Sequence, residues 1–235
     1  MRRLTLIVVL VPLLGPRLAR PPESSPPSPP PGFAVPLESP RSDPAIRVFL
    51  VPLDSREELR LTSSAAGVRF DLDGDGVLDR VSWPERSANV AFLAIDRNAD
   101  GRITSGRELV GNAMQPGARH AADALLAIVR QTQPAPSGSV HEGDAVYDQL
   151  LLWNDRNADG QGEPDELIKL RDRFTAVGLG FIMVHWLDLY GNDIRFQGWL
   201  HTRTDGPRQG EPESREEELA RRWRMFEVAL RTTGR

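Results

Sequence analysis

The hexapeptide "DRNADG" occurs twice in this chain, at Asp96–Gly101 and at Asp155–Gly160, and a related stretch, "DLDGDG", occupies Asp71–Gly76. All three place an acid or an amide at positions 1, 3 and 5 and a glycine at position 6. Ca²⁺ takes about 6–8 oxygen ligands, and a short loop with this spacing supplies several of them. The alternative is an ordinary polar turn, in which Asp and Asn hydrogen-bond to their own backbone without a metal.

The loop at Asp155 matches the EF-hand loop pattern at every ligand position. Its expected ligands are the side chains at positions 1, 3, 5 and 12 and the carbonyl at position 7: Asp155, Asn157, Asp159, Glu166 and Gln161. Glu163, at position 9, could bind directly or through a water molecule. One departure is Gly162 at position 8, where an aliphatic residue usually pairs with a partner loop.

The loop at Asp96 repeats the same start but carries its last acid one residue late. Position 12 is Arg107, which cannot bind a cation, whereas Glu108 follows directly and Gly106 lets the loop hold an extra residue. The expected ligands are therefore four side chains and the carbonyl at position 7: Asp96, Asn98, Asp100, Glu108 and Arg102.

The loop at Asp71 lies between two stretches typical of strands, which predicts a β-hairpin and no helices at this site. Its expected ligands are four carboxylates and one carbonyl: Asp71, Asp73, Asp75, Asp79 and Val77. Without a cation, each of the three loops would crowd carboxylates whose like charges repel. We therefore favour metal binding over plain turns, expect two or three ions, and prefer Ca²⁺ to Mg²⁺, which keeps more of its waters.

The rest of the folded part, residues 46–235, predicts an α+β domain. Strands are expected at 45–53, on both sides of the loop at Asp71, in a hairpin over 178–203 and at 223–230. Helical segments are expected at 118–131, at 89–95 and at 144–153, and the last two lead directly into the loops at Asp96 and Asp155. The sequence thus predicts EF-hand-like helix–loop segments, a β-hairpin calcium loop and a C-terminal antiparallel sheet.

The N-terminal residues predict export. Residues 1–19 have the layout of a secretory signal or short anchor, because two arginines precede an apolar run that is short for a membrane span. Residues 20–45 are rich in proline and predict a disordered linker. The chain has no cysteine, so thiolate metal sites are excluded. Its net charge of −4 is too small to argue for or against a nucleic-acid partner, and we expect none because the arginines are scattered and not clustered. We expect a periplasmic, secreted or membrane-anchored protein.

The order of these segments resembles a family of bacterial EF-hand-type calcium-binding proteins, often exported, whose modules also occur in large hemolysin-type calcium-binding proteins. The resemblance covers roughly residues 46–230 and is carried by "GVRFDLDGDGVLDRVSW", "AFLAIDRNADGRITSGRELVGN", "DAVYDQLLLWNDRNADGQGEPDEL", "DLYGNDIRFQGWL" and "WRMFEVAL". In that family the middle loop also carries its acid one place late, which agrees with Glu108. The resemblance implies calcium binding. It does not imply a known catalytic activity.

The sequence shows no clear catalytic pattern. None of the four histidines forms a spaced metal pair, although His185 and His201 lie on the two strands of the predicted hairpin. We expect a non-enzymatic calcium-binding module whose metal is mainly structural. Two alternatives stay open, with an unknown envelope or extracellular partner. One is a calcium-dependent adhesion or carbohydrate-binding module that exposes Trp83, Trp186 or Trp199, and the other is a hydrolase with structural calcium.

Overall fold

The structure is a computed structural model that describes residues 45–54, 58–133, 136–202 and 222–233. The predicted signal or anchor and all but the last residue of the predicted linker lie outside these residues. In the part that is described, no helix has the length and apolarity needed to cross a membrane.

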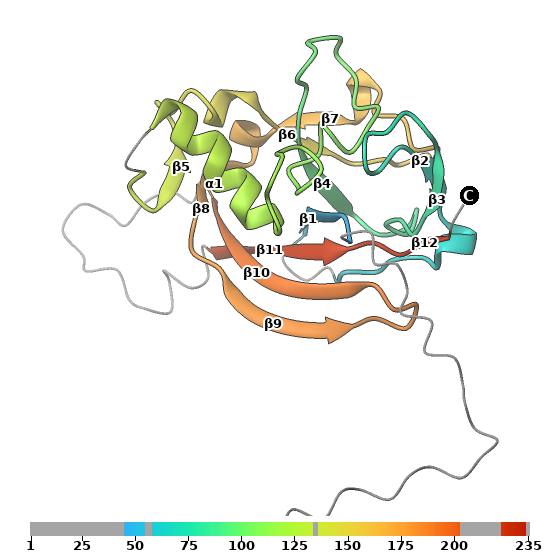
Figure 1. Ribbon diagram of the computed structural model, residues 1–235. Helices are drawn as coiled ribbons and strands as arrows, with labels where there is room; N and C mark the ends of the chain where they lie inside the picture. The colour runs from blue at the N-terminus through green and yellow to red at the C-terminus, as the bar shows by residue number, and fades with distance from the viewer. Residues whose placement is uncertain (1–44, 55–57, 134–135, 203–221, 234–235) are drawn as a thin grey trace, which may run out of the picture. The chain divides into compact units, whose positions relative to one another are not determined.

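Nine antiparallel strands form the main sheet, in the order β5-β8-β10-β11-β1-β4-β6-β7, with β9 also paired to β10 (Figure 1). Their bounds are β1 Arg47–Pro52, β4 Val90–Ile95, β5 Ser139–His141, β6 Leu150–Trp153, β7 Leu167–Lys169, β8 Phe174–Gly178, β9 Ile182–Leu187, β10 Asp193–Thr202 and β11 Arg222–Ala229. A second sheet, in the order β12-β3-β2, contains β2 Val68–Phe70, β3 Asp79–Val81 and β12 Thr232–Thr233.

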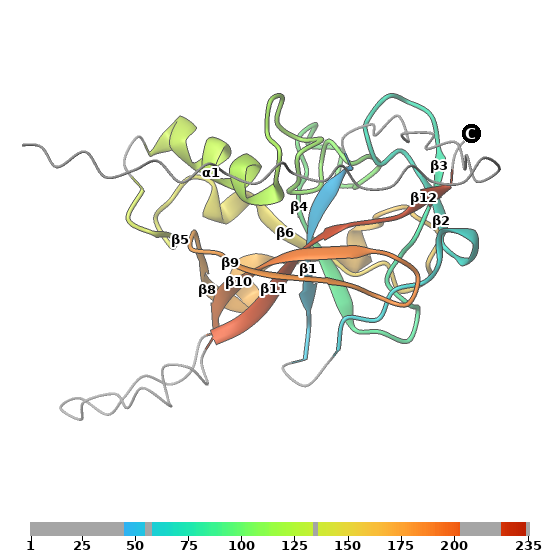
Figure 2. The ribbon, with the colours of Figure 1, turned by 60° about the horizontal axis from the view of Figure 1, so that its bottom comes forward.

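The described residues contain one α-helix, α1 (Ala121–Thr132), and four short 3₁₀ turns. The turns are η1 Ser64–Ala66, η2 Tyr147–Gln149, η3 Pro164–Glu166 and η4 Leu170–Asp172. Figures 1 and 2 both place α1 beside β5 and β8, at one end of the curled main sheet.

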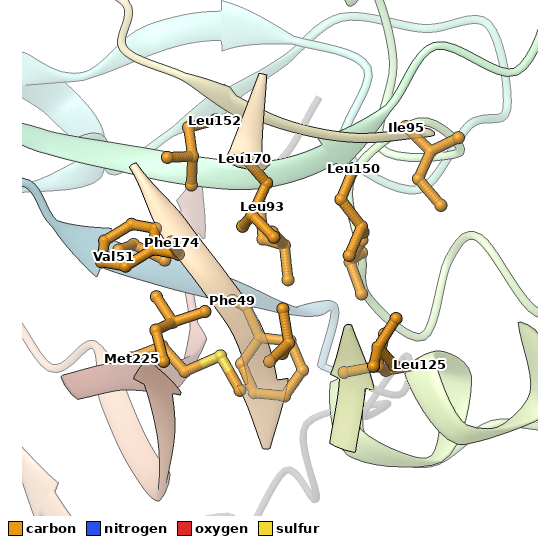
Figure 3. Packing of buried hydrophobic residues seen from close by; sticks show 14 of the residues in the cluster. Phe49, Val51, Leu93, Ile95, Leu125, Leu150, Leu152, Leu170, Phe174 and Met225 are labelled. Carbon is orange, nitrogen blue, oxygen red and sulfur yellow. The ribbon is translucent and has the colours of Figure 1, made fainter. Parts of the chain in front are cut away.

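Both faces of the central strands are buried, which gives the protein two hydrophobic cores. Along β1, Phe49 and Val51 point into one core, whereas Val48 and Leu50 point into the other. The first core, shown in Figure 3, also receives Leu125 from α1. The second core lies under the small sheet and the acidic loops, so the central strands separate the helix from the candidate metal sites.

A buried glutamate on β11 fixes the start of α1. Glu227 is fully buried, and its Oε2 accepts hydrogen bonds from the backbone N–H groups of Ala121 (2.8 Å) and Ala122 (3.4 Å). Its Oε1 lies 2.9 Å from Nδ1 of His120. The first N–H groups of a helix have no partner within the helix, and a carboxylate at this end is favoured by the helix dipole.

The predicted EF-hand-like helices are wrong. Residues 90–95, expected as a helical turn, form strand β4, and 144–153, expected as a helix, form the turn η2 followed by strand β6. Every residue of β4 is buried, because the strand is central and covered on both faces. Such a strand has a continuous apolar run that periodicity alone cannot distinguish from a buried helix. The domain is therefore mostly β, and the α+β assignment with helix–loop segments is corrected.

Replacing the buried carboxylate should loosen the helix from the sheet. Glu227→Ala is expected to lower the free energy of unfolding by about 2–4 kcal/mol, because it leaves buried N–H groups without an acceptor. Urea denaturation followed by circular dichroism measures this change. Glu142→Ala, at an exposed glutamate, is the control and should change stability by less than about 0.5 kcal/mol. Equal stability of both variants would show that the capping contact contributes nothing.

Candidate metal centres

The three acidic loops surround one cluster of buried aromatic rings. Phe70, Trp83, Phe92 and Trp153 contact one another with ring centroids 4.5–5.6 Å apart. The loop at Asp71 follows β2, the loop at Asp96 follows β4, and the loop at Asp155 begins two residues after the end of β6. Each loop is therefore attached to a strand that contributes a ring to this cluster. The packed rings hold the start of each loop in place.

The three loops share the same internal hydrogen bonds. In each, the N–H at position 6 donates to the carboxylate at position 1, at Gly76–Asp71 (3.1 Å), Gly101–Asp96 (2.8 Å) and Gly160–Asp155 (2.9 Å). The N–H at position 7 donates to the carboxylate at position 5 at 2.8 Å in all three: Val77–Asp75, Arg102–Asp100 and Gln161–Asp159. The glycine at position 6 has positive φ in each loop, at 88°, 79° and 75°, where glycine is unstrained.

In the loop at Asp71, three carboxylates converge. Asp71, Asp73 and Asp75 each place one oxygen within 4.8 Å of the other two. Asp71 is 9% exposed, and its Oδ1 is buried without a hydrogen-bond partner. Asp79, expected as a further ligand, stands at the start of β3 and is not among the three acids that converge.

In the loop at Asp96, the late acid lies with the early ones. Glu108 places a carboxylate oxygen within 4.8 Å of those of Asp96 and Asp100. Its Oε2 accepts hydrogen bonds from the N–H and the hydroxyl of Thr104, at 2.9 and 3.2 Å. Its Oε1 has no hydrogen-bond partner, and the residue is only 4% exposed, so this oxygen is also shielded from solvent. The extra residue before Glu108 therefore does not move its carboxylate away from the loop.

The loop at Asp155 is more fully hydrogen-bonded within the protein. Asp155 Oδ2 accepts from Nε1 of Trp83 at 2.8 Å. Glu166, at position 12, accepts from Nε1 of Trp153 at 3.3 Å and from the N–H of Arg156 at 2.9 Å. Among the described residues, its acids do not meet as a group of three within 4.8 Å, unlike those of the other two loops. Oε2 of Glu163 is the buried oxygen here that lacks a partner.

Burial and like charges act on the carboxyl groups of these loops. Burial raises the pKa of Asp71 above its ordinary value, and the charge of Asp73 adds to the rise. Burial likewise raises the pKa of Asp155, with a contribution from Glu166. Partial burial and the neighbouring charges of the same loop raise the pKa of Glu163. In each case ionisation of the carboxyl group is less favourable than it is in water. A nearby cation would oppose this rise in pKa.

The loops at Asp96 and Asp155 pair with each other at position 8. The N–H of Ile103 donates to the carbonyl of Gly162 at 3.2 Å, and the N–H of Gly162 donates back at 2.9 Å. A Cβ on residue 162 would lie 2.8 Å from Cβ of Ile103. Gly162, which departs from the expected aliphatic residue, thus allows this close approach, and Arg102 adds an ion pair to Glu163 at 3.1 Å.

A second glycine contact joins the loops at Asp71 and Asp96. The N–H of Gly106 donates to the carbonyl of Asp71 at 2.7 Å. A Cβ on Gly106 would lie 1.7 Å from the carbonyl oxygen of Leu72, so no other residue fits without a backbone shift. Arg107, which cannot act as a ligand, donates instead from Nε to the carbonyl of Gly74 at 2.8 Å.

Sequence reasoning did not find the contacts that hold the loops together. Trp83 is buried in the second core, and its indole N–H donates to the first carboxylate of a loop 72 positions away. The histidines do not assemble a site in the described residues: His185 lies 3.5 Å from Asp193, while His201 pairs with Ala176 of β8. The hairpin therefore does not bring His185 opposite His201. The three tryptophans considered for an adhesive face do not share one either, since Trp83 is 1% exposed.

Comparison with known proteins identifies the family. Residues 52–210 match the SPM domain, which is more than half of the chain, and the protein therefore belongs to the SPM domain family. It is also similar to the iron-regulated protein FrpA of Neisseria meningitidis serogroup C, with 28% identity over 142 residues. This similarity covers 60% of the chain but only 12% of FrpA, so the chain corresponds to a small part of that relative.

The contact between Gly106 and Leu72 should tolerate no side chain. Gly106→Ala is expected to lower the free energy of unfolding by about 2 kcal/mol or more, because the loops at Asp71 and Asp96 would be forced apart. Gly180→Ala is the matched control, since a Cβ there would have nothing within 4 Å. Thermal melting of both variants measures the difference, and equal melting temperatures would contradict the described loop contact.

Proposed function

We propose that this SPM domain binds calcium through the loops at Asp71 and Asp96, and that the metal is mainly structural. The observation that carries the proposal is the pair of buried oxygens, Oδ1 of Asp71 and Oε1 of Glu108, that belong to converging carboxylates but have no hydrogen-bond partner. A buried charged oxygen without a partner is strongly unfavourable. A hard cation at the centre of each group could bind the unpaired oxygen of that group.

The donor sets fit calcium better than other metals. They consist of carboxylate and amide oxygens from several residues of one loop, with a carbonyl available at position 7, and contain no sulfur or imidazole. Ca²⁺ accepts such sets at about 2.3–2.6 Å and in flexible geometry, whereas Mg²⁺ requires a tighter octahedron and retains waters. The side chains that would hold the metal are Asp71, Asp73 and Asp75 in one loop, and Asp96, Asn98, Asp100 and Glu108 in the other.

The loop at Asp155 would bind a third ion with lower affinity. It has the same hydrogen bonds among positions 1, 5, 6 and 7 as the other two loops. However, Glu166 already accepts N–H groups at both of its oxygens, so binding there would require the carboxylate to exchange partners. Because Ile103 and Gly162 join this loop to the loop at Asp96, an ion in either loop would help to order the other.

A structural role follows from where the loops stand. They connect strands of the small sheet and of the main sheet around one aromatic cluster, so metal bound to the native state adds directly to folding stability. Extracellular calcium modules bind at about 10⁻⁴–10⁻³ M, which suits permanent loading of an exported protein. We propose this non-enzymatic role over a hydrolase. An open hollow lined by Glu142, Tyr147, Asp148, Arg171 and Asp172 includes no loop residue and no histidine in its described lining.

Calcium titration tests the proposal. Calcium should raise the melting temperature and chelator should lower it, by an amount equivalent to about 2.7 kcal/mol when calcium is present at 100 times its dissociation constant. Glu108→Gln keeps the size of the side chain but removes the charge, and should weaken binding about tenfold or more. Isothermal titration calorimetry with Ca²⁺, and with Mg²⁺ for comparison, measures both.

The control is Glu142→Gln, which makes the same change at an exposed glutamate outside the loops. It should bind calcium like the unmodified protein. No heat of binding and no change in melting temperature with calcium would contradict the proposal. Equal weakening by both variants would mean that general charge, and not the loop at Asp96, attracts the ion.

A further inference from the structure

Most of the large apolar side chains that are exposed on the described surface belong to β9 and to the turn that joins it to β10. We call these residues the hairpin. The exposed fractions are 71% for Met183, 63% for Leu187, 98% for Leu189 and 50% for Tyr190. Ile182 and Trp186 are exposed by 50% and 41%. The remaining exposed large apolar residues, Val77 and Leu78, lie on the loop at Asp71. A concentration of this kind marks an interaction surface.

The position of β9 leaves one edge free and most of its side chains exposed, although Val184 packs partly against the second core and Trp186 contacts Phe226. Among the described strands it pairs only with β10, and Figure 1 shows it at the outer margin of the sheet. Five of its six residues are exposed, so the exposure is not confined to one face of the strand. A bulge interrupts the ladder at His185, which has φ of 30°. Bulges are one of the means that protect a free edge from pairing with another strand.

The tip of the hairpin carries one half-buried acidic side chain and one exposed basic side chain. The carboxylate of Asp188 is directed into the turn, where it accepts hydrogen bonds from the N–H of Tyr190 and from the backbone and side chain of Asn192. The side chain of Arg231 lies alongside Gly191 in the turn. Arg231 is exposed, and it forms no ion pair with any described residue.

The first residues of β10, which directly follow the turn, add a net positive charge together with Arg47 of β1. The carboxylate of Asp193 is shared by two guanidinium groups, Arg195 at 2.9 Å and Arg47 at 3.5 Å. One negative charge therefore faces two positive ones, and Nε2 of His185 lies 3.5 Å from the same carboxylate. The apolar hairpin is thus bordered by an excess of positive charge, although the whole chain has a net charge of −4.

We propose that this hairpin inserts shallowly into an anionic lipid surface, with Leu187, Leu189 and Tyr190 entering the boundary between headgroups and acyl chains. Trp186 and Tyr190 combine an apolar ring with a polar group, which is the composition that settles at a membrane interface. Lipid surrounding the tip would cover the exposed side chains on both faces of the strand, and the exposed guanidinium of Arg231 would meet anionic headgroups. A second copy of the chain fits less well, because it would bring the same arginines together.

Sedimentation with lipid vesicles tests this proposal. The full chain, in the presence of calcium, should pellet with vesicles of phosphatidylcholine containing about one third phosphatidylserine, and much less with phosphatidylcholine alone. Leu189→Asp should reduce the bound fraction at least tenfold without lowering the melting temperature, because this side chain is almost fully exposed. Arg231→Gln should weaken binding about fivefold, and only to anionic vesicles.

The control is Ala145→Asp, which places the same charge at an exposed alanine outside the hairpin and the acidic loops and should bind like the unmodified chain. Fluorescence of Trp186, taken as the difference between the unmodified chain and Trp186→Phe, should shift to the blue on anionic vesicles. Three results would overturn the proposal. The first is the absence of binding to anionic vesicles. The second is equal binding of Leu189→Asp and the unmodified chain, which would place the contact elsewhere in the chain. The third is the formation of concentration-dependent dimers that Leu189→Asp abolishes, which would identify the occupant as a second copy.

Discussion

Two of the acidic loops of this protein bring three carboxylates together, and in each loop one of the three is nearly buried. Asp71 and Glu108 are nearly buried, and each has one oxygen that accepts no hydrogen bond while it faces two further acids. Buried polar groups in proteins are almost always paired. We propose that a bound cation accounts for the two unpaired oxygens, since each belongs to a group of three converging acids. The balance of this charge matters for the second core, since the loop at Asp71 joins β2 to β3 and the loop at Asp96 directly follows β4.

The way in which the loops meet is specific to this fold. EF-hand-type loops are normally placed between helices, but here strands precede them, and all three rest on one aromatic cluster. The approach is so close that two glycines are required at the contacts, Gly106 against Leu72 and Gly162 against Ile103. The paired loops at Asp96 and Asp155 exchange two backbone hydrogen bonds at position 8. This pairing joins the candidate metal sites into one unit without any flanking helix.

The sequence predicted the local chemistry better than the architecture. The spacing of Asp, Asn and Gly fixes hydrogen bonds within a few residues, so the geometry of positions 1, 5, 6 and 7 follows from the loop itself. The association of Glu108 with Asp96 and Asp100 is also local, because the three acids lie within 13 consecutive residues. The strands β4 and β6 were mistaken for helical segments because their burial on both faces comes from partners distant in the sequence. The indole of Trp83 on Asp155 depends on the same long-range packing and had no local signal.

Anomalous diffraction from crystals grown with calcium tests the central claim most directly. The account predicts anomalous peaks about 2.3–2.6 Å from Oδ1 of Asp71 and from Oε1 of Glu108, each also within reach of the other carboxylates of its loop. It would be contradicted by crystals in calcium that show no peak at either position, with these two oxygens hydrogen-bonded to water or to protein donors instead.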